Sequence, residues 1–320
     1  MRILFITSTR VGDAVLSTGL LDHLLGRYPE ARVTIACGPA AESLFDAVPR
    51  VDRVLVVHKM ALSLHWLKLW AHCVGRAWDV IVDLRRSPLP YLLAARERRG
   101  VRSGHKALHR VLELATALDI TGEPPAPKAW IGPSHRARAA VLIPAGPPVL
   151  GVGPTANWRA KTWRAERFAE LIARLAGPQG ILPEGRVAVF GRDDERPQAL
   201  RVIESIPESR RIDLVGRLDL VDASACLERC AFYVGNDSGL MHLTAATGIP
   251  TLGLFGPSPD SRYAPWGQLA AVVRTPQAFS EIFPENFDHL ASDTLMDGLT
   301  VDAVEAAART LWARAERRPQ

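Results

Sequence analysis

Four short segments carry residue types that could do chemistry, and each follows an apolar run. The first, residues 8–13, ends in Gly12 and Asp13. Asp is among the best residues at a helix start, so capping alone explains Asp13 about as well as a reactive role does. At the end of a parallel strand, however, its carboxylate would project into the crevice where such sheets bind ligands. The helix dipole would keep it ionised, which predicts a general base.

The second segment, residues 234–246, runs from an apolar stretch through Asp237, Ser238 and Gly239 into a helical stretch. Free backbone N–H groups at a helix start bind phosphate, and Gly239 adds no side chain to obstruct it. His242 lies four residues after Ser238 and therefore on the same helical face. A lone His on a helix is usually structural, but this position favours contact with a ligand.

The third segment, residues 153–163, is a loop after another apolar run. Its cationic and hydroxyl side chains could clamp a diphosphate. A solvated loop anchored by Trp163 on the next helix is the plainer interpretation. The polar residues are Thr155, Asn157, Arg159 and Lys161.

The fourth segment, residues 190–195, ends in the acidic run Asp193, Asp194 and Glu195. Acidic residues after strands take ribose hydroxyls in nucleotide sites. Capping of the following helix explains the run nearly as well.

Other chemistries lack their motifs. The sequence has no HExxH, GxSxG or GxxxxGK[ST] pattern, and Gly151-Val152-Gly153 lacks the third glycine of a dinucleotide site. The cysteines form no CxxC pair and no metal set, so we expect no metal or cofactor and four buried thiols in a reducing compartment. They are Cys37, Cys73, Cys226 and Cys230.

Short Val/Ile/Leu runs that alternate with helical stretches predict an α/β chain with parallel sheets. The expected strands are 3–7, 32–37, 53–57, 80–83, 149–153, 187–190, 212–214, 232–235 and 251–255. The expected helices are 14–27, 62–76, 107–118, 165–176, 198–206, 240–247 and 301–314. In the helix expected at 62–76, the spacing of Leu62, Trp66 and Leu69 favours core packing, with a partly exposed lip as the alternative.

The pattern starts twice. A chain of 320 residues exceeds a single hydrophobic core, and proline clusters near residues 124–127 and 144–148 interrupt it. We therefore predict a domain of residues 1–146 and another of 147–320, with their sheets facing a central cleft. The last helix is expected in its own half or packed back on the first.

Charge is concentrated in one segment. The net charge is +5, but residues 85–110 carry +7 and the remainder −2. The basic residues of this segment are Arg85, Arg86, Arg96, Arg98, Arg99, Arg102, Lys106 and Arg110. A local basic segment points to an anionic partner, and no nucleic-acid module accompanies it. No apolar run is long enough to span a bilayer, which favours the cytoplasm.

Taken together, these segments resemble the lipopolysaccharide heptosyltransferases of glycosyltransferase family 9. The most specific parts are Gly12-Asp13, Lys161-x-Trp163 and the run from Asn236 to His242 followed by residues 254–257. The resemblance covers essentially the whole chain. It implies a GT-B architecture of two Rossmann-like domains, with the acceptor bound by the first half and an ADP-sugar by the second.

The resemblance also implies an inverting, metal-independent transfer and assigns roles. Asp13 corresponds to the base that deprotonates the acceptor, and Lys161 to the lysine that neutralises the diphosphate. Ser238 and Gly239 correspond to the phosphate donors at the helix start, Asp237 to the acidic residue beside the sugar, and Glu195 to the ribose ligand. We add Thr155 and His242 on the donor side, and Gly12, Arg85 and Arg86 on the acceptor side.

The resulting hypothesis is transfer of heptose from ADP-heptose to the inner core of lipopolysaccharide. The expected acceptor is an anionic glycolipid like lipid A–Kdo, met by a cytoplasmic protein that is peripheral at the cytoplasmic face of the inner membrane. The basic segment is expected to face that glycolipid or the membrane. The alternatives are another nucleotide-sugar or glycan acceptor, a nucleotide-sugar epimerase of the same architecture, and a noncatalytic sugar-nucleotide-binding module.

Overall fold

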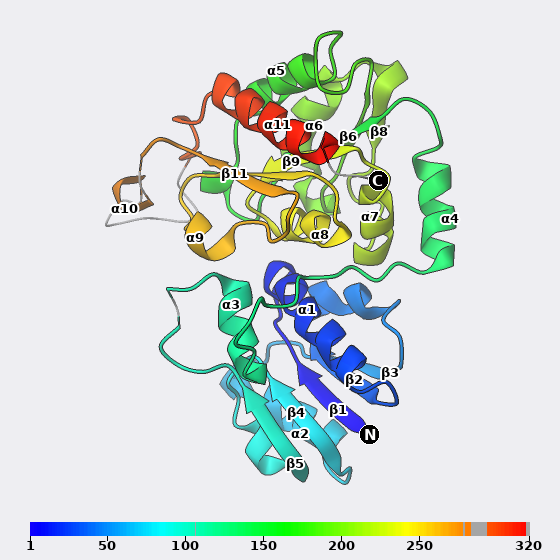
Figure 1. The fold of residues 1–320 in the computed structure, drawn as a ribbon, viewed down its shortest axis with the longest axis vertical. Coiled ribbons are helices and arrows are strands. Elements are labelled where there is room, and N and C mark those ends of the chain that lie inside the picture. The colour runs from blue at the N-terminus through cyan, green and yellow to red at the C-terminus, as the bar shows by residue number, and fades with distance from the viewer. Residues whose placement is uncertain (106, 278, 283–292, 318–320) are drawn as a thin grey trace. The chain divides into compact units, whose positions relative to one another are not determined.

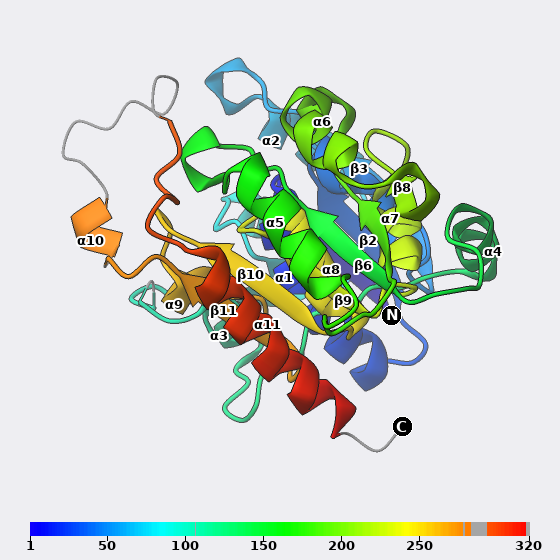
Figure 2. The same ribbon diagram turned by 90° about the horizontal axis from the view of Figure 1, so that it is seen from above.

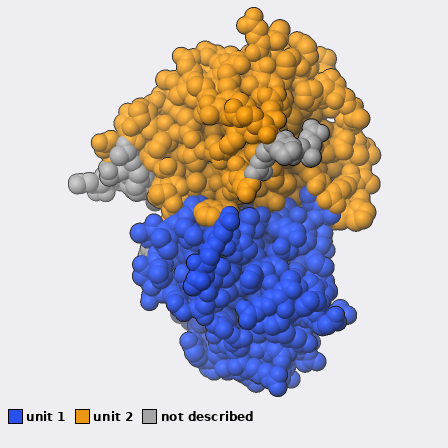
Figure 3. All heavy atoms as spheres, in the orientation of Figure 1, with its two compact units in different colours: residues 1–131 blue, residues 132–320 orange. Residues whose placement is uncertain are grey.

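The computed structural model describes all residues except 106, 278, 283–292 and 318–320. The chain forms two compact units, residues 1–131 and 132–320, which Figure 3 shows in different colours. Each unit contains one parallel sheet with helices (Figure 1). The predicted α/β class is confirmed.

Unit 1 alternates strands with helices, and η denotes a 3₁₀ helix. Its elements are β1 (Arg2–Ile6), α1 (Val11–Arg27), β2 (Arg32–Cys37), η1 (Pro39–Phe45), β3 (Val51–Val56), η2 (Ala61–Ser63), α2 (His65–Cys73), β4 (Trp78–Asp83), η3 (Leu89–Leu92), β5 (Ala95–Gly100), α3 (Arg110–Ala115) and η4 (Thr116–Leu118).

Unit 2 repeats the alternation. Its elements are α4 (Pro133–Leu142), β6 (Val149–Gly153), η5 (Arg159–Lys161), α5 (Ala165–Leu175), β7 (Arg186–Val189), η6 (Asp193–Glu195), α6 (Arg196–Ser205), η7 (Glu208–Arg210), β8 (Arg211–Asp213), α7 (Leu220–Leu227), β9 (Phe232–Asn236), α8 (Gly239–Thr247), β10 (Thr251–Phe255), α9 (Asp260–Tyr263), β11 (Ala270–Arg274), α10 (Phe279–Ile282) and α11 (Val301–Glu316).

The sheet of unit 1 has the order β3-β2-β1-β4-β5, and its central strand is buried on both faces. Leu4 and Ile6 of β1 belong to a core cluster with Leu69 of α2. Their neighbours Ile3 and Phe5 point to the opposite face and are equally buried. Burial on both faces explains why β1 is a continuous apolar run.

The sheet of unit 2 has the order β11-β10-β9-β6-β7-β8. On one face of the adjacent central strands β6 and β9, glycines leave space that side chains would otherwise occupy. A Cβ on Gly153 would lie 2.0 Å from the Tyr233 hydroxyl oxygen, and one on Gly235 would lie 2.4 Å from it. The buried Tyr233 ring therefore occupies space that side chains at these two positions would fill.

Strand β5 is absent from the predicted strands because its sequence, ARERRG, is charged. It pairs in parallel with β4 at the edge of the sheet, and its residues alternate between partly buried and exposed. Charged residues are tolerated at a sheet edge, where they discourage pairing with other chains. The basic segment thus contains a strand that apolar patterning does not detect.

The units divide at residues 131 and 132, whereas the sequence suggested residue 146. Helix α4 lies between these points and packs on α7. The Asp222 carboxylate of α7 lies 3.0 Å from His135 Nδ1 of α4 and 2.9 Å from a guanidinium nitrogen of Arg138. The proline-rich segment therefore lies inside unit 2. Helix α11 also packs in unit 2, against α5 and β11.

The helix expected at 62–76 begins only at His65, and the core packing expected for Leu62 is wrong. The Leu62 side chain is 94% exposed, whereas Leu69 is buried and Trp66 is half-buried. Leu62 lies in the short η2 with φ +50°. Because it is outside α2, its spacing from Trp66 and Leu69 does not place its side chain on their helical face. Across the described residues, no helix is both long and apolar enough to cross a membrane.

The four cysteines are free and buried, as predicted. Burial raises the pKa of the Cys37 and Cys226 thiols to about 12 and that of Cys73 to about 11. The pKa of the fully buried Cys230 thiol is also raised. In the part of the chain that the structure describes, no three or more His, Cys, Asp or Glu side chains are grouped to hold a metal ion.

We predict that the native thiols resist alkylation. The thiolate is the reactive species, and a pKa of about 12 leaves roughly one thiolate in 10⁴ at pH 8. Ellman's reagent at pH 8 should label none of the four cysteines rapidly in the native protein and all four in guanidinium chloride. Rapid labelling of any one cysteine in the native state would contradict its burial.

Candidate active site

Three neighbouring strands of unit 2 bring together the residues predicted to bind a donor. Thr155 follows β6, Glu195 follows β7 and Asp237 follows β9, and these strands stand in the order β9-β6-β7. The strands are parallel, so their carboxyl ends lie at one edge of the sheet. Sequence spacing alone placed each residue after a strand, and the strand order makes them neighbours.

Lys161 and Asp237 form an ion pair across this edge. Lys161 Nζ lies 2.5 Å from Asp237 Oδ2, and the Asp237 side chain is buried. The pair fixes the loop after β6 next to the turn that starts α8. Lys161 also lies 5.8 Å from the centre of the Trp158 ring. A cation held beside a helix start is suited to an anionic group.

Helix α8 begins at this corner with Ser238 as its N-cap. The Ser238 hydroxyl accepts a hydrogen bond from the Met241 N–H at 3.5 Å, and its carbonyl accepts one from His242 at 3.4 Å. The N–H groups of Gly239 and the next residue precede the first bond of the helix ladder. His242 is buried one turn into the helix. The arrangement leaves backbone donors at the edge where Lys161 sits.

Glu195 serves both as a cap and as a partner of Thr155. Glu195 Oε2 accepts a hydrogen bond from the Thr155 hydroxyl at 2.9 Å and another from the Arg192 N–H at 2.9 Å. The capping interpretation of the acidic run therefore describes a real contact. The link to Thr155 in addition connects the ends of β6 and β7.

Asn236 positions the loop of residues 154–163, a role that sequence reasoning missed. Its side chain is completely buried, donates to the Pro154 carbonyl at 2.8 Å and accepts from the Trp163 N–H at 3.1 Å. Trp163 is buried too, and its indole N–H donates to the Leu299 carbonyl at 2.9 Å. Asn236 therefore fastens both ends of the loop that carries Lys161. The signal was a polar residue at the end of a buried strand.

In unit 1, Asp13 does not cap its helix. Helix α1 begins after Arg10, and Asp13 lies in its first turn. Asp13 Oδ1 accepts a hydrogen bond from Arg110 Nε at 3.1 Å, and Arg110 also lies 2.6 Å from Glu113, which is buried. The capping explanation thus fails. Sequence reasoning placed Arg110 in the basic segment but missed its contact with Asp13, since the two residues lie 97 positions apart.

The predicted acceptor residues lie at the same edge of this sheet. Gly12 is beside Asp13 in α1, and Arg85 and Arg86 follow β4. The Arg85 guanidinium lies 4.8 Å from the centre of the Trp66 ring, and burial lowers its pKa. Arg86 lies 3.5 Å from Glu113 and donates to a backbone carbonyl. Glu113 therefore links Arg86 to Arg110.

Much of the remaining basic segment is engaged within unit 1. Arg99 pairs with Glu97 and Asp119, and Arg102 also pairs with Asp119. Arg98 donates to three backbone carbonyls, and Arg96 lies 3.6 Å from an acidic side chain. Lys106 lies outside the described residues. These contacts balance part of the segment's charge locally, and its role toward an anionic partner stays a prediction.

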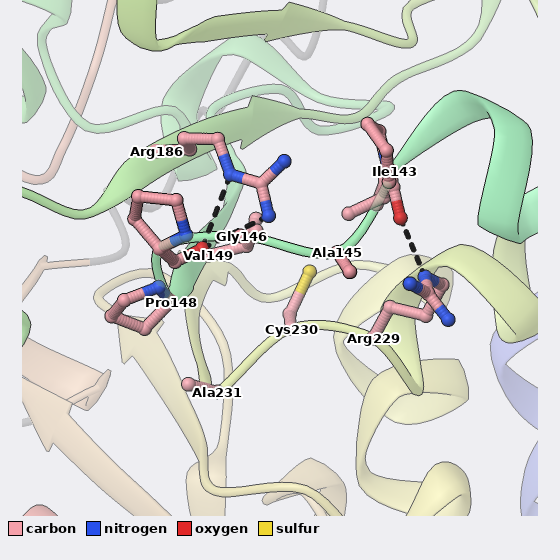
Figure 4. A pocket seen from close by; sticks show the side chains of 11 residues that line it. Ile143, Ala145, Gly146, Pro148, Val149, Arg186, Arg229, Cys230 and Ala231 are labelled. Atoms are coloured by element: carbon pink, nitrogen blue, oxygen red, sulfur yellow. Dashed lines mark hydrogen bonds between the residues drawn. The ribbon is translucent and has the colours of Figure 1, made fainter.

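A cavity of about 220 Å³ lies at the other edge of the sheet of unit 2 (Figure 4). Arg186 donates to the Pro147 carbonyl, and Arg229 donates to the Ile143 carbonyl at 2.6 Å. Arg186 begins β7, so this cavity is at the amino ends of the strands. None of the predicted site residues lines it. The two arginines fasten the segment that precedes β6.

Comparison with known proteins gives the family and the fold. A lipooligosaccharide heptosyltransferase 2 of Haemophilus influenzae is 24% identical over 314 residues, covering 86% of this chain and 88% of that protein. Among solved structures, a family 9 glycosyl transferase of Veillonella parvula matches 98% of this chain and 97% of its own, with TM-score 0.80 and 20% identity. The E. coli ADP-heptose lps heptosyltransferase II matches 99% and 100%, with TM-score 0.75 and 21% identity.

The fold is therefore GT-B, as the resemblance implied. The family model described as glycosyltransferase family 9 (heptosyltransferase) matches residues 76–283. That match covers strands β4 and β5 of the first sheet and all six strands of the second. The chain belongs to glycosyltransferase family 9 and is a glycosyltransferase.

Proposed function

We propose that this glycosyltransferase moves a heptose from ADP-heptose to the inner core of lipopolysaccharide. The observation that carries the proposal is the corner where Lys161, paired with Asp237, sits beside the start of α8. The corner offers one cation and backbone N–H donors, which is what a sugar-linked diphosphate needs. The names of the relatives supply the sugar and the acceptor.

On the donor side, residues that follow different strands contact different parts of the ADP-sugar. Glu195 and Thr155, already hydrogen-bonded to each other, take the ribose hydroxyls. Lys161, Ser238 and Gly239 take the diphosphate. Asp237, behind Lys161, and the buried His242 lie on the side of the transferred sugar.

On the acceptor side, Asp13 is the base. It accepts the proton of the acceptor hydroxyl as that oxygen bonds to the anomeric carbon, and the bond from that carbon to the diphosphate breaks with its electron pair leaving on ADP. Arg110 holds the Asp13 carboxylate in place. A single displacement of this kind inverts the anomeric configuration. Lys161 and the helix start stabilise the leaving diphosphate, so the step proceeds without a metal ion.

The proposed acceptor is an anionic glycolipid of the lipid A–Kdo kind. Arg85 and Arg86 follow β4 at the edge of the sheet that bears Asp13, and Gly12 precedes Asp13 in α1. Such an acceptor is anchored in a bilayer, so the proposal places a cytoplasmic enzyme at the cytoplasmic face of the inner membrane.

The test of function is direct. Purified protein with ADP-heptose and a lipid A–Kdo acceptor in EDTA should yield the heptosylated glycolipid with inverted configuration. Thermal melts with ADP-, UDP- and GDP-sugars should show stabilisation by the ADP-sugar of about 2.7 kcal/mol at a 100-fold excess over its Kd. A preference for UDP or GDP would refute the heptose donor, and a requirement for divalent metal would refute the proposed stabilisation by Lys161.

Replacing the base should remove turnover but not donor binding. Asp13→Asn keeps the size of the side chain but cannot take the proton, so kcat should fall by about 10²- to 10⁴-fold. ADP affinity, measured by calorimetry, should stay unchanged. The matched control is Asp22→Asn, which alters another ion-paired carboxylate of the same helix, 2.7 Å from Lys128, and should keep full activity. Near-normal transfer by Asp13→Asn would disprove the assignment.

Replacing the cation, unlike replacing the base, should weaken donor binding. Lys161→Ala removes a charge-assisted contact to the diphosphate, so ADP affinity should fall by about 10- to 100-fold. Lys128→Ala, which removes a lysine from an exposed ion pair, should leave ADP affinity unchanged. Equal ADP affinity for Lys161→Ala and the parent would exclude Lys161 from the diphosphate site.

A further inference from the structure

Unit 1 exposes a run of large apolar side chains just before and within the start of α2. Leu62 is 94% exposed and Leu67 61%, and Met60 and Leu64 are also exposed. Single exposed apolar residues are ordinary, but contiguous apolar patches on a protein surface mark interaction sites. The core does not need these residues, because α2 contributes Leu69 and Cys73 to it instead.

The local backbone directs this segment outward. Leu62 and Ser63 have φ values of +50° and +59°, a region that residues with side chains seldom adopt. The turn they form, η2, ends before α2 begins at His65. In Figure 2 the light-blue chain leading into α2 lies at the periphery of unit 1. A strained turn that presents a leucine to solvent points to a use for that leucine.

A second exposed apolar pair adjoins α2. Tyr91 and Leu92 of η3 are 80% and 62% exposed. The Trp70 indole N–H of α2 donates to the Leu92 carbonyl at 3.0 Å, so the two elements are tied together. We call the whole surface the docking surface; its residues are Met60, Leu62, Leu64, Leu67, Tyr91 and Leu92.

The two segments that form the docking surface carry charges of one sign. Residues 53–78 contain no Asp or Glu and four basic residues, and residues 84–96 likewise contain no acid. Lys59 and Lys68 are exposed, and neither forms an ion pair with any residue that the structure describes. Apolar side chains interleaved with lysines are typical of segments that lie in a membrane interface. Segments 53–78 and 84–96, which carry no carboxylate of their own, complement anionic headgroups.

We propose that the docking surface binds a bilayer with anionic headgroups, with Leu62 and Leu67 entering the interface and Lys59 and Lys68 resting on the headgroups. The proposal rests on the proposed function for the presence of a membrane and deepens it by naming the surface that meets the bilayer, whatever sugar is transferred. It also assigns membrane contact to residues 59–68 and 91–92 rather than to the arginines engaged along β5.

The position of the surface in unit 1 gives the docking a consequence. The chain leaves β3 for η2, leaves β4 for η3, and leaves β1 for the turn that carries Asp13. These strands are parallel, so all three connections start at the same edge of the sheet. Docking would therefore hold the edge bearing Asp13 toward the bilayer in which a lipid-linked acceptor is anchored.

The experiment is co-sedimentation of the full chain with vesicles that contain no acceptor. Parent protein should bind vesicles of phosphatidylcholine with 30% phosphatidylglycerol and bind vesicles of pure phosphatidylcholine weakly. Leu62→Ser with Leu67→Ser should lower the partition coefficient by about tenfold or more per leucine. Lys59→Gln with Lys68→Gln should lower it about fivefold per lysine and reduce its salt dependence.

Matched measurements separate the outcomes. Leu200→Ser, the same change at a leucine of α6 that is 42% exposed, should bind vesicles as the parent does. ADP affinity and melting temperature should be unchanged in every variant. Absence of parent binding to anionic vesicles, or binding that survives the double leucine change, would overturn the proposal. Loss of self-association in gel filtration, with vesicle binding intact, would instead identify a surface between two copies. Failure of heptosyl transfer would leave vesicle binding untouched.

Discussion

The direction of the strands is the constraint on which the candidate site depends. Because β9, β6 and β7 run parallel and adjacent, three loops that are distant in sequence leave one edge together. On one face of β6 and β9, Gly153 and Gly235 also leave room for the Tyr233 ring. A side chain at either glycine would push against the strand that positions Asp237. The chemistry of the edge is therefore set by the packing beneath it.

Each unit keeps its key carboxylate in an ion pair. Asp13 is held by Arg110, and Asp237 by Lys161. A partly buried pair gains little net stability, because desolvation offsets the attraction, but it fixes geometry. In the proposed reaction Arg110 keeps its partner, whereas Lys161 must share its charge with the incoming diphosphate. An ion pair thus orients the Asp13 carboxylate in one unit and positions the Lys161 ammonium for the diphosphate in the other.

The sequence predicted what local pattern and apolar burial determine. Strands such as 32–37 and 149–153 were found at their observed bounds because both their faces are buried. Strand β5 was missed because its charges suit an edge, a property of the sheet rather than of the segment. Leu62 was misplaced because periodicity does not reveal a left-handed turn. The Asp13–Arg110 contact depends on how α3 packs beside α1, which no local pattern encodes.

Net charge alone does not separate the charges that are free to meet an anionic partner from those already engaged, since it counts charges without their neighbours. Residues 85–110 hold most of the excess, yet Arg98 and Arg99 are engaged by carbonyls and carboxylates of their own unit. Lys59 and Lys68 contribute less to the count, but they stand in a stretch without acids beside exposed leucines. A charge attracts a partner most when no opposite charge lies nearer to it. Exposed apolar side chains beside such a charge can in addition insert into a membrane interface. The proposed contact with the bilayer therefore lies beside α2, whereas Arg85 and Arg86 keep their proposed role toward the acceptor.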